Sequence, residues 1–116
     1  MRRPLRVLFV CSRNRLRSPT AEAVVRDWRD VEALSAGTAP DADVRVSADL
    51  LAWADVVVAF EGRHRRRLAA DFGPLLRDTP VRVLGVPDDY AFMDPALVDL
   101  LRARLPGLLG VDAPPA

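Results

Sequence analysis

The chain has one cysteine and one histidine, and it has no lysine, isoleucine or glutamine. A single cysteine excludes an internal disulfide, which fits a reducing compartment, and one histidine beside it is too few for a zinc site. No apolar stretch approaches the length of a membrane span, and the apolar run behind the basic N-terminus is too short for a signal peptide. We therefore expect a cytoplasmic protein that makes no contact with a membrane.

Length and charge limit the remaining classes. With 116 residues, half of them hydrophobic, the chain has the size of one domain and can bury a single core. The net charge of +1 creates no global field that favours nucleic acid, so we interpret the arginine-rich residues 63–67 as a solvated helix face. We expect a folded domain over residues 1–109, a disordered tail over residues 110–116, no nucleic acid partner, and a monomer or weak homodimer.

Strand-like and helix-like segments alternate along the chain, and there is no internal repeat. Such alternation predicts an α/β fold with about four parallel strands, right-handed crossovers and helices on both faces, which makes three layers. The expected strands are residues 5–10, 31–35, 55–60 and 81–86, and the expected helices are residues 18–28, 47–52, 61–72 and 94–105. Ser47 and Asp94 are the expected N-caps of the second and last helices.

The segment between the first strand and the first helix holds most of the reactive residues. Cys11 ends the apolar run of residues 7–10, while Ser18 and Pro19 suit the N-cap and first position of the next helix. The loop therefore lies at a helix N-terminus, where free N–H groups and the helix dipole attract anions and favour a thiolate. The candidate site residues here are Cys11, Ser12, Arg13, Asn14, Arg15, Leu16, Arg17 and Ser18.

These residue types suit an attack on a phosphate group. A thiolate at Cys11 is a strong nucleophile, and the planar guanidinium of Arg17 can grip two phosphate oxygens at once. Ser18 can donate a hydroxyl hydrogen bond to the sulfur. Asn14, the only asparagine, tolerates a left-handed backbone and can bond across the loop. Successive loop N–H groups can hold the other phosphate oxygens.

A carboxylic acid is needed to protonate the leaving oxygen, and Asp88 and Asp89 follow the fourth expected strand. Because the carboxyl ends of parallel strands lie at one edge of a sheet, both are expected near Cys11. Adjacent carboxylates repel, which favours protonation of one of them, and the same group can later activate water. We interpret Asp94 as a helix cap and His64 as a solvated helix residue.

Several short motifs follow one another along most of the chain in an order that is found in a known family. They are residues 7–11 (VLFVC), Asn14, residues 17–22 (RSPTAE), residues 35–38 (SAGT) and residues 88–90 (DDY). In these motifs the chain resembles the low-molecular-weight protein tyrosine phosphatases. The resemblance implies that Cys11 is the nucleophile, Arg17 the phosphate clamp, Asn14 and Ser18 supports of the loop and thiolate, Asp88 the general acid and Tyr90 part of the pocket lining, with no metal or cofactor.

The chain also departs from the pattern of that family. Arg13 stands where the family usually has glycine, Leu16 where it often has a second cysteine, and Asp89 where it has proline, so Asp89 is an alternative acid. The family normally has an extra loop and helix after Thr38 that build one wall of the pocket, and this chain is short there. We therefore expect an open, arginine-rimmed pocket that binds phosphate well and discriminates poorly among leaving groups.

Three functions fit these observations. The first is cysteine-dependent hydrolysis of phosphomonoesters through a phosphocysteine, as in a protein tyrosine phosphatase, with a phosphorylated protein or a small phosphomonoester as substrate. The second is a non-enzymatic module that binds phosphate or a phosphoprotein. The third is an arsenate reductase that uses an external thiol, since no second cysteine is present. The sequence leaves open the physiological substrate, specificity for phosphotyrosine, and the choice between Asp88 and Asp89.

Overall fold

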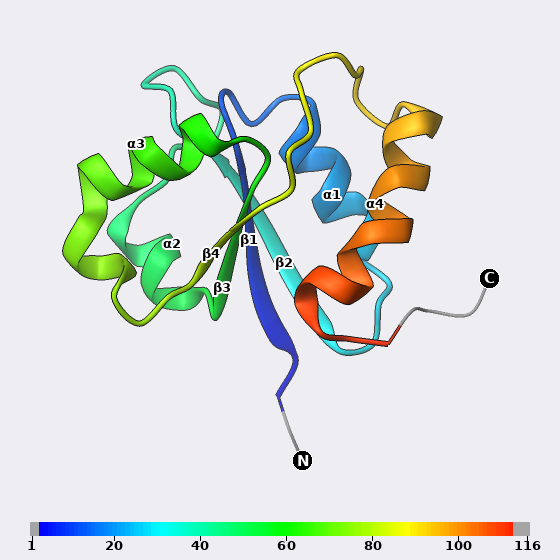
Figure 1. The fold of residues 1–116 in the computed structure, drawn as a ribbon, viewed down its shortest axis with the longest axis horizontal. Helices are drawn as coiled ribbons and strands as arrows, with labels where there is room; N and C mark the ends of the chain where they lie inside the picture. The colour runs from blue at the N-terminus through cyan, green and yellow to red at the C-terminus, as the bar shows by residue number, and fades with distance from the viewer. Residues whose placement is uncertain (1–2, 113–116) are drawn as a thin grey trace.

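A parallel sheet forms the middle layer of the structure, a computed structural model that describes residues 3–112. Its four strands lie in the order β2-β1-β3-β4 and all run parallel (Figure 1). The strands are β1 (Leu5–Cys11), β2 (Val31–Gly37), β3 (Val56–Ala59) and β4 (Val81–Val83). The helices are α1 (Arg17–Val25), α2 (Ala48–Trp53), α3 (Gly62–Phe72) and α4 (Pro95–Leu109), with a short 3-10 turn (Gly73–Leu76) after α3.

The side chains of β1 alternate between two hydrophobic cores. Val7, Phe9 and Cys11 belong to the core shared with α1 and α4. Leu8 and Val10 belong to the core shared with α2 and α3. Figure 1 shows the two helix pairs on opposite sides of the sheet. The period of two places successive strand residues on opposite faces, and the predicted three-layer α/β class is confirmed.

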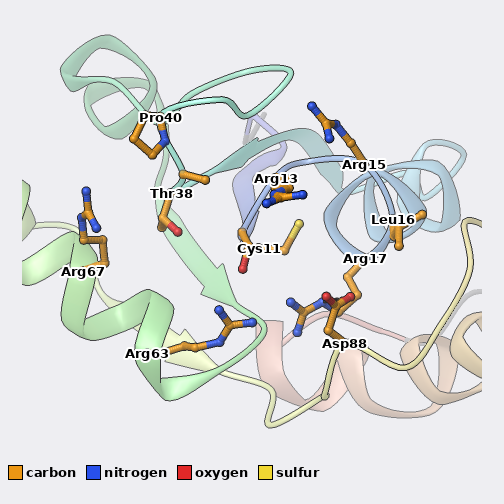
Figure 2. Close-up of a pocket in the computed structure, with 12 residues that line it drawn as sticks. Cys11, Arg13, Arg15, Leu16, Arg17, Thr38, Pro40, Arg63, Arg67 and Asp88 are labelled. Atoms are coloured by element: carbon orange, nitrogen blue, oxygen red, sulfur yellow. Dashed lines mark ion pairs between the residues drawn. The ribbon is translucent and has the colours of Figure 1, made fainter.

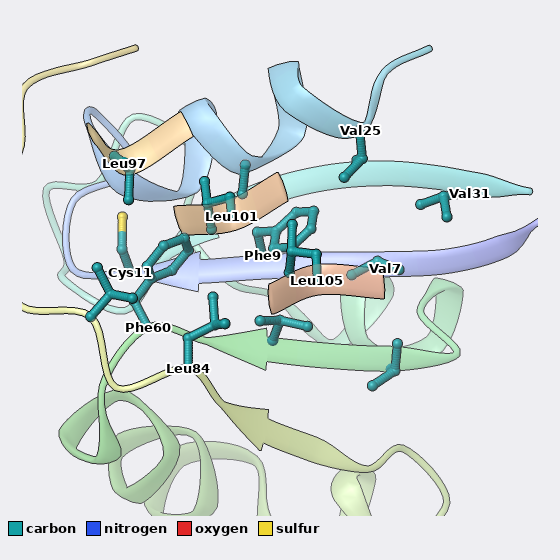
Figure 3. Close-up of a cluster of buried hydrophobic side chains, with 14 of the residues drawn as sticks. Val7, Phe9, Cys11, Val25, Val31, Phe60, Leu84, Leu97, Leu101 and Leu105 are labelled. Carbon is teal, nitrogen blue, oxygen red and sulfur yellow. The ribbon is translucent and has the colours of Figure 1, made fainter. Parts of the chain in front are cut away.

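Cys11 is the last position of β1 on the face covered by α1 and α4. Figure 3 shows its side chain at the end of the strand that also carries Phe9, close to Leu97 of α4. Leu97, Leu101 and Leu105 are fully buried, and their helical spacing places them on one apolar side of α4. The sheet and a packed core therefore hold the backbone of Cys11 in place.

The last helix is longer than predicted. α4 continues past Pro106 to Leu109. Proline cannot donate the backbone hydrogen bond of a helix, and the packing of Leu109 against the core offsets this loss. Gly110 then ends the helix with a left-handed φ of 69°, and Val111 also packs against the core. Val111, in the predicted tail, thus contacts the core, and residues 113–116 of that tail lie outside the described residues.

The first helix and the fourth strand are shorter than predicted. α1 ends at Val25, and the chain leaves the helix in a turn before β2. β4 ends at Val83, because Gly85 has a φ of 74°, which is incompatible with extended backbone. The chain nevertheless stays beside β3, since the N–H of Val86 donates to Phe60 O at 2.8 Å. This hydrogen bond guides the segment after β4 toward the end of β1.

Two of the helix N-caps agree with the sequence. Ser47 caps α2 by accepting the N–H of Leu50 at 3.2 Å, and Asp94 caps α4 by accepting the N–H of Ala96 at 2.9 Å. The interpretation of Asp94 as a cap is therefore confirmed.

α4 has 15 residues, and within residues 3–112 no helix has the length and apolar content needed to cross a bilayer.

Candidate active site

A cavity of about 740 Å³ opens at the edge of the sheet where β1 ends (Figure 2). The loop between β1 and α1 contributes to it, together with the loop after β2, the exposed side of α3 and the segment after β4. These segments converge because parallel strands end at the same edge. The described residues that line the cavity are Cys11, Ser12, Arg13, Arg15, Leu16, Arg17, Thr38, Ala39, Pro40, Arg63, Arg67 and Asp88.

Asn14 shapes the loop beneath this cavity. It has a φ of 59°, the left-handed conformation that the sequence predicted, and its side chain is buried. Its Nδ2 donates to Ser18 Oγ at 3.0 Å and to Ser35 Oγ at 2.8 Å, and Ser35 donates in turn to Glu22 at 2.6 Å. The asparagine therefore ties the turn of the loop to the start of α1 and to β2.

Ser18 contacts the cysteine sulfur instead of capping α1. The helix begins at Arg17 with Leu16 at the N-cap position and no side-chain cap, so the predicted capping role of Ser18 is wrong. Ser18 Oγ lies 2.9 Å from Cys11 Sγ and accepts a hydrogen bond from Asn14. Because that bond uses an oxygen lone pair, the hydroxyl hydrogen can point at the sulfur, where it stabilises a thiolate.

The loop after β2 engages carbonyl groups that would otherwise repel an anion. The carbonyl oxygens of Cys11, Ser12 and Arg13 accept N–H bonds from Thr38, Ala39 and Asp43 at 3.0, 2.8 and 3.1 Å, respectively. Gly37 permits this close approach, since a Cβ there would lie 2.4 Å from the carbonyl oxygen of Ser12. The glycine of the SAGT motif is thus required by the packing of β2 against the loop.

Arg17 is held in one orientation by its surroundings. Its side chain is 2% exposed, and Nη1 donates to the backbone oxygen of Val86 at 2.8 Å and to the carboxylate of Glu61. The guanidinium also lies 5.9 Å from the ring centroid of Phe60. Hydrogen bonds from Arg63 and then from Arg17 lower the pKa of Glu61 to about 2, so Glu61 is an anion at neutral pH.

Asp88 lines the cavity, whereas Asp89 and Tyr90 are not among its lining residues. Asp88 Oδ1 lies 3.6 Å from Nε of Arg17, and Figure 2 shows the two side chains side by side. Asp89 is exposed. Tyr90 packs against the core shared with α1 and α4, which differs from the place in the lining that the resemblance implied.

His64 is buried with 1% of its surface exposed, so its interpretation as a solvated residue is wrong. Its Nδ1 accepts the N–H of Glu61 at 3.0 Å, which completes a capping box at the start of α3. With Nδ1 as an acceptor, the neutral ring carries its hydrogen on Nε2, which lies 2.9 Å from Ser12 Oγ. His64 therefore donates to Ser12 and cannot act as a base for it, and the hydroxyl hydrogen of Ser12 is left to donate elsewhere.

The buried histidine predicts a specific pH dependence of stability. Burial, followed by the charges of Arg17 and Arg63, lowers the pKa of His64 from 6.5 to about 4. Its contribution to the free energy of unfolding is complete above pH 6.5. That contribution is lost as the pH falls toward 4, by up to about 1.4 kcal/mol per pH unit, because the unfolded chain binds the proton first. Urea unfolding at several pH values should show this slope in the wild type and a smaller one in His64→Asn, and equal slopes would contradict the assignment.

Glu61 and His64 are not among the candidate residues that the sequence predicts. An acidic N-cap followed three residues later by a polar residue, directly after a buried strand, is the signal that indicates such a capping box. Arg63 and Arg67 belong to residues 63–67, for which the sequence predicts a solvated helix face. They lie four positions apart, so they share one side of α3, and this side lines the cavity.

Comparison with known proteins identifies the fold. No protein-family model matches the chain, and no curated protein is significantly similar to it. Its structure is similar to a low-molecular-weight protein tyrosine phosphatase from Bacillus subtilis, with 23% identity, a TM-score of 0.67, and coverage of 91% of this chain and 98% of that chain. It is also similar to the tyrosine phosphatase Wzb from Escherichia coli K30 in complex with phosphate. The identity is 19%, the TM-score is 0.62, and the alignment covers 83% of this chain and 89% of that chain.

A third similar structure is a cysteine-to-serine mutant of the arginine phosphatase YwlE with a phosphorylated active-site serine. It has 23% identity and a TM-score of 0.68, and the alignment covers 93% of this chain and 97% of that chain. The three-layer arrangement of helices around one parallel sheet is thus the fold of the low-molecular-weight protein tyrosine phosphatases. The fold that the sequence motifs implied is confirmed.

Proposed function

We propose that the protein hydrolyses phosphomonoesters through a covalent phosphocysteine at Cys11. The observation that carries this proposal is the position of the only cysteine in the arginine-lined cavity. Its sulfur lies 2.9 Å from Ser18 Oγ, and the buried Arg17 lines the same cavity. A thiolate, a fixed guanidinium and a loop whose carbonyls are engaged elsewhere are the groups that phosphoryl transfer to sulfur needs.

The reaction has two steps in this proposal. Sγ of Cys11 attacks phosphorus, so that an S–P bond forms and the P–O bond to the leaving group breaks. Asp88 gives its proton to the departing oxygen. A water molecule then attacks phosphorus and gives a proton back to Asp88, the S–P bond breaks, and inorganic phosphate leaves with the thiolate restored. Arg17 neutralises charge on the phosphoryl oxygens in both steps, and Ser18 stabilises the thiolate.

The three similar structures support this assignment. They are a tyrosine phosphatase with phosphate, an arginine phosphatase whose active-site serine is phosphorylated, and a low-molecular-weight protein tyrosine phosphatase. A phosphorylated protein or a small phosphomonoester is therefore the substrate class that we assign. Residues matched by the motifs, namely Cys11, Asn14, Arg17, Ser18 and Asp88, carry the assigned roles.

The single cysteine permits a direct test of this function. We expect the protein to hydrolyse a chromogenic aryl phosphate between about pH 5 and pH 8 in the presence of a chelator. One equivalent of iodoacetate should abolish the activity by alkylating Cys11, and inorganic phosphate should protect against the loss. Full activity of the alkylated protein would contradict the mechanism. Phosphate binding without turnover would favour a binding module, and arsenate-dependent oxidation of an external thiol would favour the reductase.

A further inference from the structure

The cavity offers far more positive charge than one phosphate group can use. Five of its lining residues are arginines, and Asp88 is the one acidic residue among the described lining residues. Arg17 serves the phosphate in the proposed function, which leaves the exposed side chains of Arg13, Arg15, Arg63 and Arg67 around the mouth. The volume of about 740 Å³ also leaves ample room beside a phosphate for the rest of a substrate.

Two of the rim arginines, Arg13 and Arg67, have carboxylate neighbours that hold them only weakly. Arg13 lies 3.8 Å from Asp41, and both side chains are more than 60% exposed. The pair of Arg67 and Asp71 is a solvent-exposed contact between residues four apart on α3. Exposed pairs of this kind contribute little to stability, and a ligand anion can replace the carboxylate at small cost. These guanidinium groups are therefore available for binding.

Arg63 is placed close to the phosphate clamp. Its Nη2 donates to Oε1 of Glu61 at 2.9 Å, and the same oxygen accepts from Arg17. Two guanidinium groups thus share one carboxylate oxygen. The single negative charge of Glu61 does not balance both of them, so positive charge remains beside the phosphate position. Figure 2 shows Arg63 extending from α3 toward the cavity, between Arg67 and Arg17.

The lining is poorly suited to an aromatic leaving group. No aromatic side chain belongs to the lining among residues 3–112, and the partly buried Tyr90 packs against the core instead. The apolar lining residues are limited to small or aliphatic ones such as Leu16 and Pro40. An aromatic ring would therefore find no aromatic side chain to stack on, whereas an anionic group would find several guanidinium donors.

We propose that Arg63 and Arg67 on α3, with Arg13 across the cavity, form a second anion subsite, so that the substrate is a phosphomonoester whose leaving group carries its own carboxylate or phosphate. This inference rests on the proposed phosphatase function and specifies its substrate class. The same chemistry occurs in small phosphorylated acids and in phosphopeptides with acidic neighbours. In both, the second anion replaces Asp41 or Asp71 at the rim while Arg17 holds the reacting phosphate.

The test compares paired substrates that differ mainly in the second charge. The small pair is phenyl phosphate and 3-carboxyphenyl phosphate. The peptide pair consists of phosphotyrosine peptides with aspartate or alanine on both sides. The wild type should prefer the charged member of at least one pair by roughly five- to tenfold in kcat/KM at low salt, and the preference should shrink as salt is added. A preference confined to one pair shows whether the second anion belongs to a small phosphorylated acid or to a phosphopeptide.

Matched arginine variants assign the preference to the rim. Arg63→Gln/Arg67→Gln should lose it, whereas Arg65→Gln/Arg66→Gln, which removes the same charge from the same helix outside the cavity lining, should keep it. Equal rates within both wild-type pairs would overturn the second subsite while leaving the phosphatase function intact. No turnover of any of the four substrates would overturn the proposed function itself. The wild-type ratios decide the matter even if the double variant does not fold.

Discussion

The Cys11→Ser protein is expected to hydrolyse aryl phosphates roughly 10⁶-fold more slowly than the wild type, the scale of loss seen when the nucleophile of a covalent enzyme is removed. A hydroxyl at this position is far less ionised than a thiol, so it attacks phosphorus poorly. The hydroxyl of Ser12, which also lines the cavity, is a poor substitute, because it accepts a hydrogen bond from His64 Nε2 and the histidine cannot act as its base. The measurement is kcat/KM with a chromogenic aryl phosphate.

Retained ligand binding separates a chemical loss from a folding defect. The serine side chain has nearly the volume of cysteine, and Arg17 keeps its contacts with Val86 and Glu61, so inorganic phosphate should still bind. Isothermal titration of phosphate into both proteins checks this. Activity of Cys11→Ser close to that of the wild type would show that the reaction does not pass through the sulfur.

The Asp88→Asn protein is expected to lose about 10²- to 10⁴-fold in kcat/KM with a poor leaving group such as an alkyl phosphate, the usual contribution of a general acid. The loss should be much smaller with a nitrophenyl phosphate, because a stabilised leaving oxygen departs without a proton. Asp88 lines the cavity 3.6 Å from Arg17, so its carboxyl group is placed beside the phosphate position. A series of substrates with leaving groups of increasing basicity measures the effect.

Asp89→Asn provides the matched control for that experiment. It removes the same charge one residue away, from a side chain outside the cavity lining, and should change the rates little. The comparison answers the question that the sequence left open, namely which of the two aspartates is the acid. A larger loss in Asp89→Asn than in Asp88→Asn would transfer the role to Asp89 and require the segment after β4 to move on binding.

The parts of the site that depend on short stretches of sequence could be predicted. The apolar run of β1 puts Cys11 at the sheet edge, and Asn14 adopts the left-handed turn because few other residues tolerate it. Because parallel strands end at the same edge of a sheet, the sequence alone places Asp88 at the edge where Cys11 lies. At these positions the local backbone preferences and the topology of the sheet favour the same structure.

The parts that depend on tertiary packing could not be predicted. Ser18 looks like a helix cap from its place before a proline, but Asn14 and the sulfur of Cys11 engage its hydroxyl group instead. His64 stands among arginines in the sequence, yet it is buried because the start of α3 packs against the loop after β1. Leu109 extends α4 past a proline for the same kind of reason, since burial outweighs the missing hydrogen bond.

The most direct test of the mechanism is to look for phosphate on the sulfur. Asp88→Asn should be mixed with a nitrophenyl phosphate, quenched within the first turnovers and digested, because slowed hydrolysis by water lets the intermediate accumulate. Mass spectrometry of the fragment that contains Cys11 should then show one added phosphoryl group, which is absent when Cys11→Ser/Asp88→Asn is treated in the same way. Product formation by Asp88→Asn with unmodified Cys11 at every time point would contradict a phosphocysteine intermediate.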